Sequence, residues 1–355
     1  MAGNKARKRF LRLLSTLVVA LLGVIAVLRF AWSRSYRGFS GGEKFLVVAR
    51  GTSAYDVARV LQREGIVRHW ALFLSYMRLA KPGIRLQAGE YRFDVPLSTI
   101  QTADKLIHGW IYYHELTIPE GFSSFDIADL LEQRGLSSAQ DFLAAAGNAV
   151  TLSGLNVEAG NLEGFLFPDT YRLARGTTPQ EIAQIMVKRF REIYEALGPE
   201  IKQSALSFTE ILTLASLIEK ETGVDAEREL VSAVFHNRLK KRMLLQCDPT
   251  VIYAARLKGN YRGRIFQSDL DFDSPYNTYR RLGLPPGPIA NPGKRSIEAA
   301  LKPAKVDFLY FVANNIGGHV FSRTLAEHRR AVAAYRRGQA LRERHILQAG
   351  AARKG

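Results

Sequence analysis

An uncharged apolar run near the start of the chain constrains its fold most strongly. No charged residue occurs between Leu13 and Leu28, and residues 30–32 extend the run past Arg29. A run of about 20 residues is long enough for one membrane-spanning helix. Arg29 can extend its guanidinium to the membrane surface, and Trp32 suits the interface. The sequence therefore predicts a single spanning helix over residues 13–33.

Basic residues before this run predict its orientation. Five Lys and Arg residues lie within residues 5–12, ahead of the first acidic residue, Glu43. Such a cluster favours a cytoplasmic N-terminus, so we expect an inner-membrane anchor and a periplasmic body from about residue 34. A cleaved signal peptide is the alternative, because Ala31-Trp32-Ser33 resembles a small-x-small cleavage site, and a buried soluble helix is a third reading. The length of the run and its bulky flanks favour an uncleaved anchor.

The charge balance limits the classes of partner. Fifty Lys and Arg residues against 33 Asp and Glu give a net charge of +17, which raises nucleic acid, anionic lipid and acidic polymers as partners. A periplasmic address and the lack of a basic-aromatic binding motif argue against nucleic acid. The single cysteine, Cys247, excludes an intramolecular disulfide and a Cys-rich metal site. His236, His319 and His328 are isolated, so we expect neither a metal nor a cofactor.

An internal repeat follows the predicted anchor. Residues 50–61 return as residues 120–131, an offset of 70 residues, and each copy follows a short apolar run. Each copy predicts a strand, a turn and a helix, with Ser53 or Ser123 as the helix cap. The first copy resembles a LysM-type sugar-binding unit, although a duplicated structural unit explains the same pattern. The identical pairs are Gly51/Gly121, Ser53/Ser123, Asp56/Asp126, Ala58/Ala128, Leu61/Leu131 and Gly65/Gly135.

Two glutamates stand at the end of a predicted helix. Ser207-Phe208-Thr209-Glu210 has the form of a capping box, so a helix is expected from there through Thr222. Relative to the apolar stripe, Glu219 lies about 80° to one side and Glu221 about 80° to the other. A carboxyl that loses water on such a flank favours its protonated form, as a general acid requires. Alternatively both glutamates are solvated or pair with Lys220 and Arg228. Helix geometry does not decide which of Glu219 and Glu221 would be the acid.

Other polar side chains suit sugar recognition. Asn237 lies among apolar neighbours on a helix expected at 226–240, with Asp225 as its cap, and can bind a sugar or hold a loop. A stretch rich in Pro, Gly, Asn and Asp between residues 244 and 293 is predicted to be a long loop, and in a compact domain such a loop is usually either functional or a sign that the secondary structure has been assigned wrongly. The candidates in this loop are Gln246, Asp248, Tyr276 and Asn277.

A cluster near residue 165 offers a second carboxylate. Glu163 and Asp169 bracket Gly-Phe-Leu-Phe-Pro, and either could complete a hydrolase pair. No nucleophile elbow and no Walker phosphate loop occurs in the sequence, which removes common hydrolase and nucleotide readings.

Six motifs in order resemble the MltG (YceG-like) family of endolytic murein transglycosylases. The similarity spans about residues 44 to 340 and includes the position of the anchor. Cys247 departs from the family, which usually has a hydroxyl or another small residue there, and both termini are unmatched. The motifs are Glu163–Tyr171, Ala215–Thr222, Phe235–Leu239, Leu245–Tyr253, Tyr276–Tyr279 and Gly283–Ile289.

This resemblance implies a membrane-anchored lytic transglycosylase that cleaves MurNAc-β1,4-GlcNAc bonds within nascent glycan strands. It implies 1,6-anhydro-MurNAc ends, a role in terminating strand elongation, and peptidoglycan polymerases as partners. By the same resemblance Glu219 is the catalytic acid and Glu221 supports it. The expected sugar-binding residues are Asn237, Gln246, Asp248, Tyr276, Asn277 and Glu163.

The expected fold class is α+β, with a transmembrane helix, a LysM-like βα module and a mixed α/β catalytic domain. Two alternatives remain open: a non-catalytic peptidoglycan-binding scaffold, and a glycan hydrolase that uses Glu163 or Asp169. The predicted parts are a basic cytoplasmic tail (1–12), the transmembrane helix (13–33), a tether (34–43), a LysM-like and linking region with the repeat (44–150), the catalytic domain (151–345) and a tail (346–355).

Overall fold

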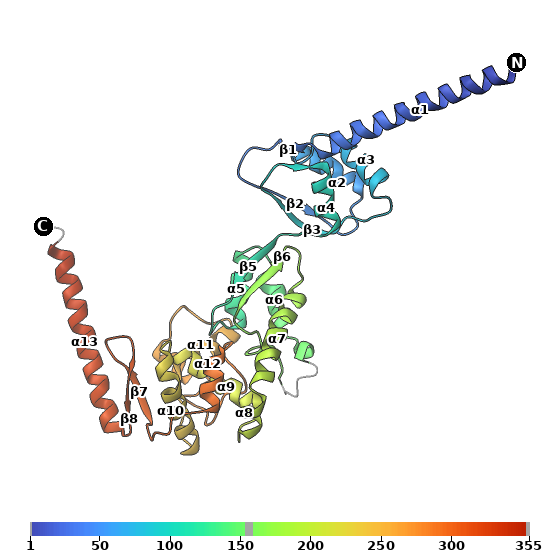
Figure 1. The fold of residues 1–355 in the computed structure, drawn as a ribbon. Coiled ribbons are helices and arrows are strands. Elements are labelled where there is room, and N and C mark those ends of the chain that lie inside the picture. Colours follow the sequence, from blue (N-terminus) through green and yellow to red (C-terminus); the bar gives the residue numbers. More distant parts are fainter. Residues whose placement is uncertain (1, 153–158, 353–355) are drawn as a thin grey trace. The chain divides into compact units, whose positions relative to one another are not determined.

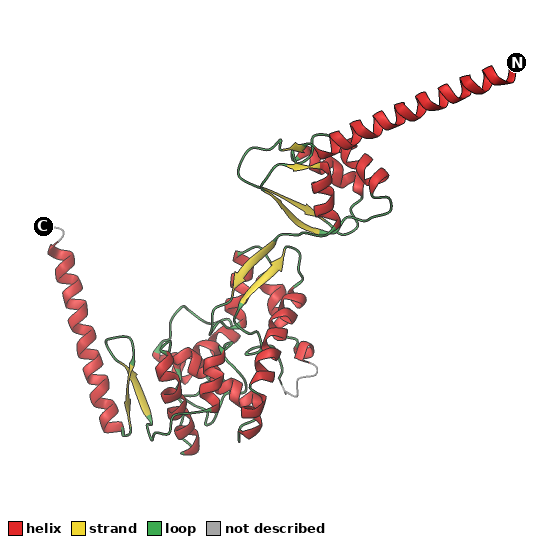
Figure 2. Ribbon diagram, viewed as in Figure 1, coloured by secondary structure: helices red, strands yellow, loops and turns green. Residues whose placement is uncertain are grey.

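The computed structural model, which describes residues 2–152 and 159–352, is mixed α+β, as predicted (Figures 1 and 2). It divides into a first unit, Met1–Glu115 with Arg172–Gly176, and a second unit, Leu116–Tyr171 with Thr177–Gly355. The boundary crosses strands β5 (Tyr113–Thr117) and β6 (Thr170–Ala174), which pair with each other. The sheets formed by the described residues are all two-stranded.

The first unit packs helices around an antiparallel pair of strands, β2 (Lys44–Val48) and β3 (Gly89–Phe93). Antiparallel pairing runs from Lys44 opposite Phe93 to Val48 opposite Gly89. Alternate side chains of these strands, including Leu46 and Tyr91, are buried, as a half-covered sheet requires. The elements are β2 (Lys44–Val48), α2 (Ala54–Arg63), α3 (Trp70–Ala80), β3 (Gly89–Phe93) and α4 (Thr99–Ile107).

The N-terminal helix α1 (Ala2–Ser33) joins this unit directly. Its portion Arg7–Ser33 is long and apolar enough to cross a membrane, and most of its large apolar side chains are exposed. At its end the Trp32 Nε1 donates to the Ser75 Oγ at 3.0 Å, and the indole packs on Tyr76. The segment expected to be a tether contains β1 (Ser35–Tyr36), which pairs antiparallel with β4 (Leu97–Ser98).

Both copies of the repeat form the predicted strand, turn and helix, but they belong to different units. The first is β2 followed by α2, and the second is β5 followed by α5 (Ser124–Gln133). The turn glycines Gly51 and Gly121 have φ of 82° and 75°, a conformation that glycine adopts without strain. Ser53 and Ser123 cap the helices by accepting from a main-chain N–H three residues on.

The second unit is largely helical (Figure 2). Helix α9 (Phe208–Glu221) lies at its centre and packs against the helices α10, α11 and α12. The remaining elements are α6 (Ala139–Ala146), η1 (Ala149–Leu152), α7 (Pro179–Ala196), α8 (Gly198–Gln203), η2 (Asp225–Glu227), α10 (Arg228–Lys240), α11 (Asp248–Leu257), η3 (Gln267–Asp271), α12 (Lys294–Leu301), β7 (Tyr310–Ala313), β8 (His319–Ser322) and α13 (Leu325–Ala352).

Two local predictions in this unit were wrong. The stretch 244–293 is not one continuous loop, because α11 occupies Asp248–Leu257, and Pro249 fits its first turn, where no N–H is needed. Asp225 does not cap α10, which begins only at Arg228 without a side-chain cap. The Asp225 carboxylate pairs instead with the Arg228 guanidinium.

Candidate functional site

Glu219 lies in the last turn of α9, and the sequence positions it there by two local devices. The predicted capping box is present, since Ser207 and Glu210 exchange hydrogen bonds at the helix start. The stripe of Ile211, Leu214 and Ile218 is fully buried. Because this stripe fixes the rotation of α9, Glu219 is directed to its flank, with 6% of its side chain exposed.

Both oxygens of the Glu219 carboxylate have partners. Oε1 lies 3.2 Å from the Arg228 Nη2, and Oε2 accepts the Gly293 N–H at 2.9 Å. Two hydrogen bonds from different elements, α10 and the start of α12, hold the carboxylate in one orientation. A guanidinium and a main-chain N–H both favour an ionised carboxylate.

Arg228 is the buried cation of this site. Its side chain is 6% exposed, and its Nε donates to the Ser296 Oγ at 3.1 Å. The guanidinium also pairs with Asp225, and its Nη2 lies 3.7 Å from an oxygen of Glu120. One guanidinium therefore serves three carboxylates, and removing it would leave Glu219 as an uncompensated buried charge.

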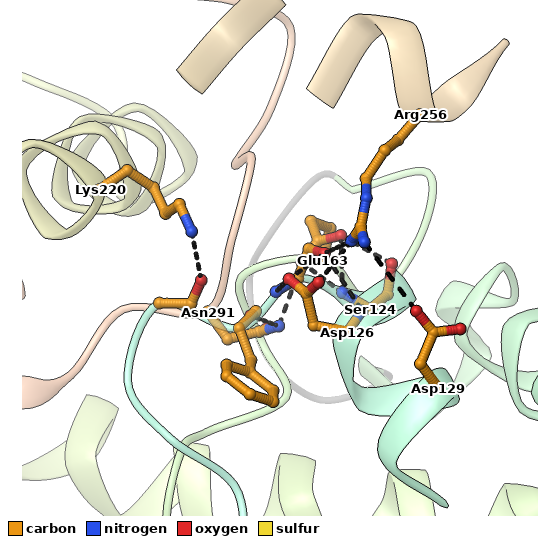
Figure 3. A network of polar contacts seen from close by, with 10 residues as sticks. Ser124, Asp126, Asp129, Glu163, Lys220, Arg256 and Asn291 are labelled. Carbon is orange, nitrogen blue, oxygen red and sulfur yellow. Dashed lines mark hydrogen bonds and ion pairs between the residues drawn. The ribbon is translucent and has the colours of Figure 1, made fainter. Parts of the chain in front are cut away.

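The turn of the second repeat copy covers Glu219. A Cβ at Gly121 would lie 3.3 Å from the Glu219 Cγ, so this turn packs against the glutamate itself. The Lys220 ammonium donates to the Gly121 carbonyl at 3.2 Å (Figure 3), and the Gly121 N–H donates to the Asn291 carbonyl at 2.9 Å. The repeat thus supplies a wall of the candidate site.

Glu163 is buried within a second polar network (Figure 3). Its carboxylate accepts from the Ser124 N–H and hydroxyl, the shortest contact being 2.7 Å, and from the Asn291 amide at 3.0 Å. It also shares a hydrogen bond with Tyr253. Burial raises the pKa of Glu163 to about 7, against the opposing effect of the Ser124 hydrogen bonds. This carboxyl therefore keeps a proton nearly to neutral pH.

A pocket of about 640 Å³ adjoins Glu163. Its lining includes Asn161, Phe165, Tyr276 and the segment Pro286–Pro288, so aromatic and apolar faces stand beside polar groups. Such a lining suits sugars, whose faces are apolar and whose edges are polar.

One stretch of chain connects this pocket to Glu219. After Pro288, the Ile289 N–H donates to the Ser216 Oγ on α9, and Asn291 binds the second repeat copy and Glu163. Gly293 then contacts Glu219. Gly293 is six positions after Gly287, so this wall of the pocket lies within about 20 Å of the residue that binds Glu219.

Glu221 lies in surroundings different from those of Glu219, as the helical geometry predicts. It is partly buried. Burial raises its pKa, while a hydrogen bond with the Cys247 thiol lowers it. The charge of nearby Asp248 also raises this pKa, and nearby Arg238 lowers it. Burial also raises the pKa of the Cys247 thiol well above its ordinary value. Glu221 therefore faces the start of α11, and Glu219 faces α10 and α12.

The two predicted asparagines hold loops. The Asn237 amide donates to the carbonyls of Val306 and Phe308 at 2.9 and 3.0 Å. The fully buried Asn277 donates to the carbonyls of Leu270 and Phe272 at 2.9 and 2.7 Å. These bonds give each amide a structural task, and sugar binding by either stays a prediction.

Gln246 and Asp248 are exposed beside the start of α11. Gln246 has φ of 50°, which is uncommon outside glycine and marks a constrained position. Asp248 accepts a hydrogen bond from the Tyr279 hydroxyl. Tyr276 packs its ring 5.0 Å from that of Tyr253 and lines the pocket near Glu163.

Several residues of the site were not found from sequence. Ser124, Asn291 and Gly293 carry no local signal, because their partners are more than 30 residues away along the chain. Glu120 did carry a sequence signal. It stands where the first repeat copy has Arg50, although the glycine and serine that follow are the same in both copies.

Comparisons with known proteins cover most of the chain. The sequence model of the YceG-like family matches residues 46–334. A Bacillus subtilis protein named endolytic murein transglycosylase is 36% identical over 304 residues, which cover 81% of this chain and 83% of that protein. A Streptococcus pneumoniae protein of the same name is 30% identical over 334 residues, which cover 81% of this chain and 59% of the Streptococcus pneumoniae protein.

A solved structure is also similar. The crystal structure of a YceG-like protein from Listeria monocytogenes matches with a TM-score of 0.56 and 32% identity, over 82% of this chain and 99% of that one.

Proposed function

The chain belongs to the YceG-like family, and from this membership and the surroundings of Glu219 we propose how it acts as an endolytic murein transglycosylase. The protein is a lytic transglycosylase of peptidoglycan. The observation that carries the assignment is the 36% identity to the Bacillus subtilis transglycosylase along four fifths of the chain.

Glu219 is the proposed acid of the reaction. Its protonated carboxyl gives a proton to the oxygen between MurNAc C1 and GlcNAc, the C1–O bond breaks, and an oxocarbenium-like centre develops at C1. The MurNAc 6-hydroxyl then attacks C1, and the ionised Glu219 accepts the hydroxyl proton. A 1,6-anhydro-MurNAc end forms, no water is consumed, and one residue serves as acid and then base.

The surroundings of Glu219 support both halves of this cycle. The Arg228 guanidinium and the Gly293 N–H stabilise the carboxylate left after proton donation. They also hold it in one orientation, which a residue that transfers a proton twice requires. Glu221 supports α9 from its other flank.

Substrate contacts are proposed along the stretch that leads to the pocket beside Glu163. Tyr276 and the segment Pro286–Pro288 supply the apolar faces there, and Glu163 is a buried polar group at its edge. Gln246 and Asp248 extend the site at the start of α11. Asn237 and Asn277 contribute through the loops that they hold.

The protein is proposed to be anchored in the inner membrane by its N-terminal helix. The apolar helix α1 anchors the chain as a single pass, with the N-terminus in the cytoplasm and both units in the periplasm, because basic residues precede the span. The strand, turn and helix of residues 44–65 form a LysM-like unit that binds glycan. Nascent strands are the substrate, and polymerases that make them are proposed partners.

Product analysis tests the assignment. Full-length protein and Glu219→Gln are incubated with peptidoglycan, and the fragments are identified by mass spectrometry. Glutamine keeps the size of the side chain and removes the acid, so anhydro-MurNAc ends are expected from the native protein and not from the variant. Glu229→Gln, which changes an exposed carboxylate on α10, is the matched control and should stay active.

Two other outcomes lead to different functions. Reducing ends would indicate a hydrolase. Asp169 is a poor candidate for the second catalytic carboxylate of such an enzyme, because it already forms an ion pair with Arg189 at 2.7 Å. Unchanged glycan from the folded native protein would indicate a binding scaffold.

A further inference from the structure

A second carboxylate shares the guanidinium of Glu219. The Arg228 Nη2 lies 3.2 Å from an oxygen of Glu219 and 3.7 Å from an oxygen of Glu120. Because both oxygens lie on the same nitrogen, they are no more than about 7 Å apart, within the range of strong like-charge interaction. The Glu120 side chain is 49% exposed, so it also has access to solvent.

The backbone around Glu120 is built to bring it there. Gly121 packs on the Glu219 side chain, and a Cβ at Gly293 would overlap the Glu120 carboxylate. Gly293 therefore contacts both acids, since its N–H binds Glu219. The first repeat copy has the same turn but carries Arg50 at this position, so the turn itself does not require an acid.

The charges around Glu120 come from four elements. Glu219 and Lys220 lie on α9, Asp225 on η2, Arg228 on α10 and Arg295 on α12. The two guanidiniums serve the three carboxylates, and the Lys220 ammonium is engaged by the Gly121 carbonyl.

The charge of Glu219 acts on the Glu120 carboxyl. Burial, and then the charge of Glu219, raise the pKa of Glu120, while Arg228 and Arg295 lower it.

We propose that Glu120 is a positioning residue of the transglycosylase, which by occupying Arg228 beside Glu219 allows Glu219 to hold the proton that it donates. This inference rests on the proposed function of Glu219. Without the Glu120 charge, the Arg228 guanidinium would be shared only with Asp225 and would act more strongly on Glu219, favouring its ionised form. Ionised Glu219 accepts a proton but has none to give to the leaving oxygen.

The pH profile of the reaction tests this role. The rate of anhydro-MurNAc release is measured from acid to neutral pH for the full-length protein, Glu120→Gln and Glu120→Asp. In Glu120→Gln, the limb on which activity falls with rising pH is expected to move about one pH unit lower. Activity at neutral pH then falls about tenfold and returns at lower pH. Glu120→Asp keeps the charge and should restore most of the native profile.

The control is Glu298→Gln, which removes a carboxylate of similar exposure, 44%, paired with Lys294 on the outer side of α12. It changes the net charge by the same amount and should leave the profile unchanged.

Three outcomes would overturn the inference. An unmoved limb in a folded, active Glu120→Gln protein would mean that Glu120 does not act on Glu219. Equal loss at every pH, without recovery in acid, would make Glu120 either a structural residue or the proton donor itself. Equal shifts in Glu120→Gln and Glu298→Gln would indicate a general charge effect. If the native protein releases no anhydro ends at any pH, the proposed function fails first, so the two failures are distinguishable.

Discussion

Glu163 is predicted to make the second unit less stable as the pH rises toward neutral. Its carboxyl is buried, and burial raises its pKa from the ordinary value of 4.5 to about 7. The folded protein therefore retains a proton on Glu163 over a pH range in which the unfolded chain has lost it. The stabilisation from this group is complete below the pKa of the unfolded chain and is lost as the pH rises through the pKa of the folded protein.

The size of the effect follows from the two pKa values. Each unit of difference corresponds to about 1.4 kcal/mol, so the free energy of unfolding should fall by about 3 kcal/mol between pH 4.5 and 7. Above pH 7 this contribution no longer changes. Glu163→Gln cannot ionise and should lack this slope. The amide loses acceptor capacity toward Ser124 and Asn291, so the variant should also be less stable at low pH.

The assay is urea unfolding of native protein and Glu163→Gln in detergent at a series of pH values. Far-UV circular dichroism follows the second unit, which contains most of the helices. All three tryptophans, Trp32, Trp70 and Trp110, lie in the first unit, so their fluorescence provides an internal control that should not respond to the substitution. Stability curves of native protein and variant that run parallel between pH 4.5 and 7 would refute the reasoning.

Two further substitutions separate a loop-holding residue from a sugar-binding one. Asn277→Ala leaves the Leu270 and Phe272 carbonyls without their donor and should lower the free energy of unfolding by about 3 kcal/mol. Urea unfolding measures this change, and a value below about 1 kcal/mol would contradict the loop-holding role. Tyr276→Leu keeps an apolar side chain against Tyr253 but removes the aromatic face, so KM for glycan should rise about tenfold with kcat nearly unchanged, measured by initial rates. A fall in kcat alone would place Tyr276 outside substrate binding.

Much of the secondary structure was predictable because its signals are local. The capping box at Ser207 and the apolar stripe behind it predicted α9 and the flanking positions of its two glutamates, and the structure confirms both. The repeat predicted two strand-turn-helix units, with caps at Ser53 and Ser123. These signals act within one or two turns of chain, so they can be read without knowing the fold.

The errors came where local signals were ambiguous. Pro249 suggested a loop, but proline also fits the first turn of a helix, and α11 begins there. Asp225 has the side chain of a cap, but it pairs with Arg228, whose position depends on the packing of α10 against α9.

Sequence by itself determined the α+β class, the apolar helix at the N-terminus, the family and the helix that carries Glu219, because these depend on periodicity, capping and motif order. Only the tertiary structure decided what surrounds Glu219. Arg228, Gly293 and Glu120 reach it from three separate segments, and Glu163 meets Ser124 and Asn291 across 39 and 128 residues of chain. Contacts of this kind follow from how buried faces pack together, and no local pattern records them.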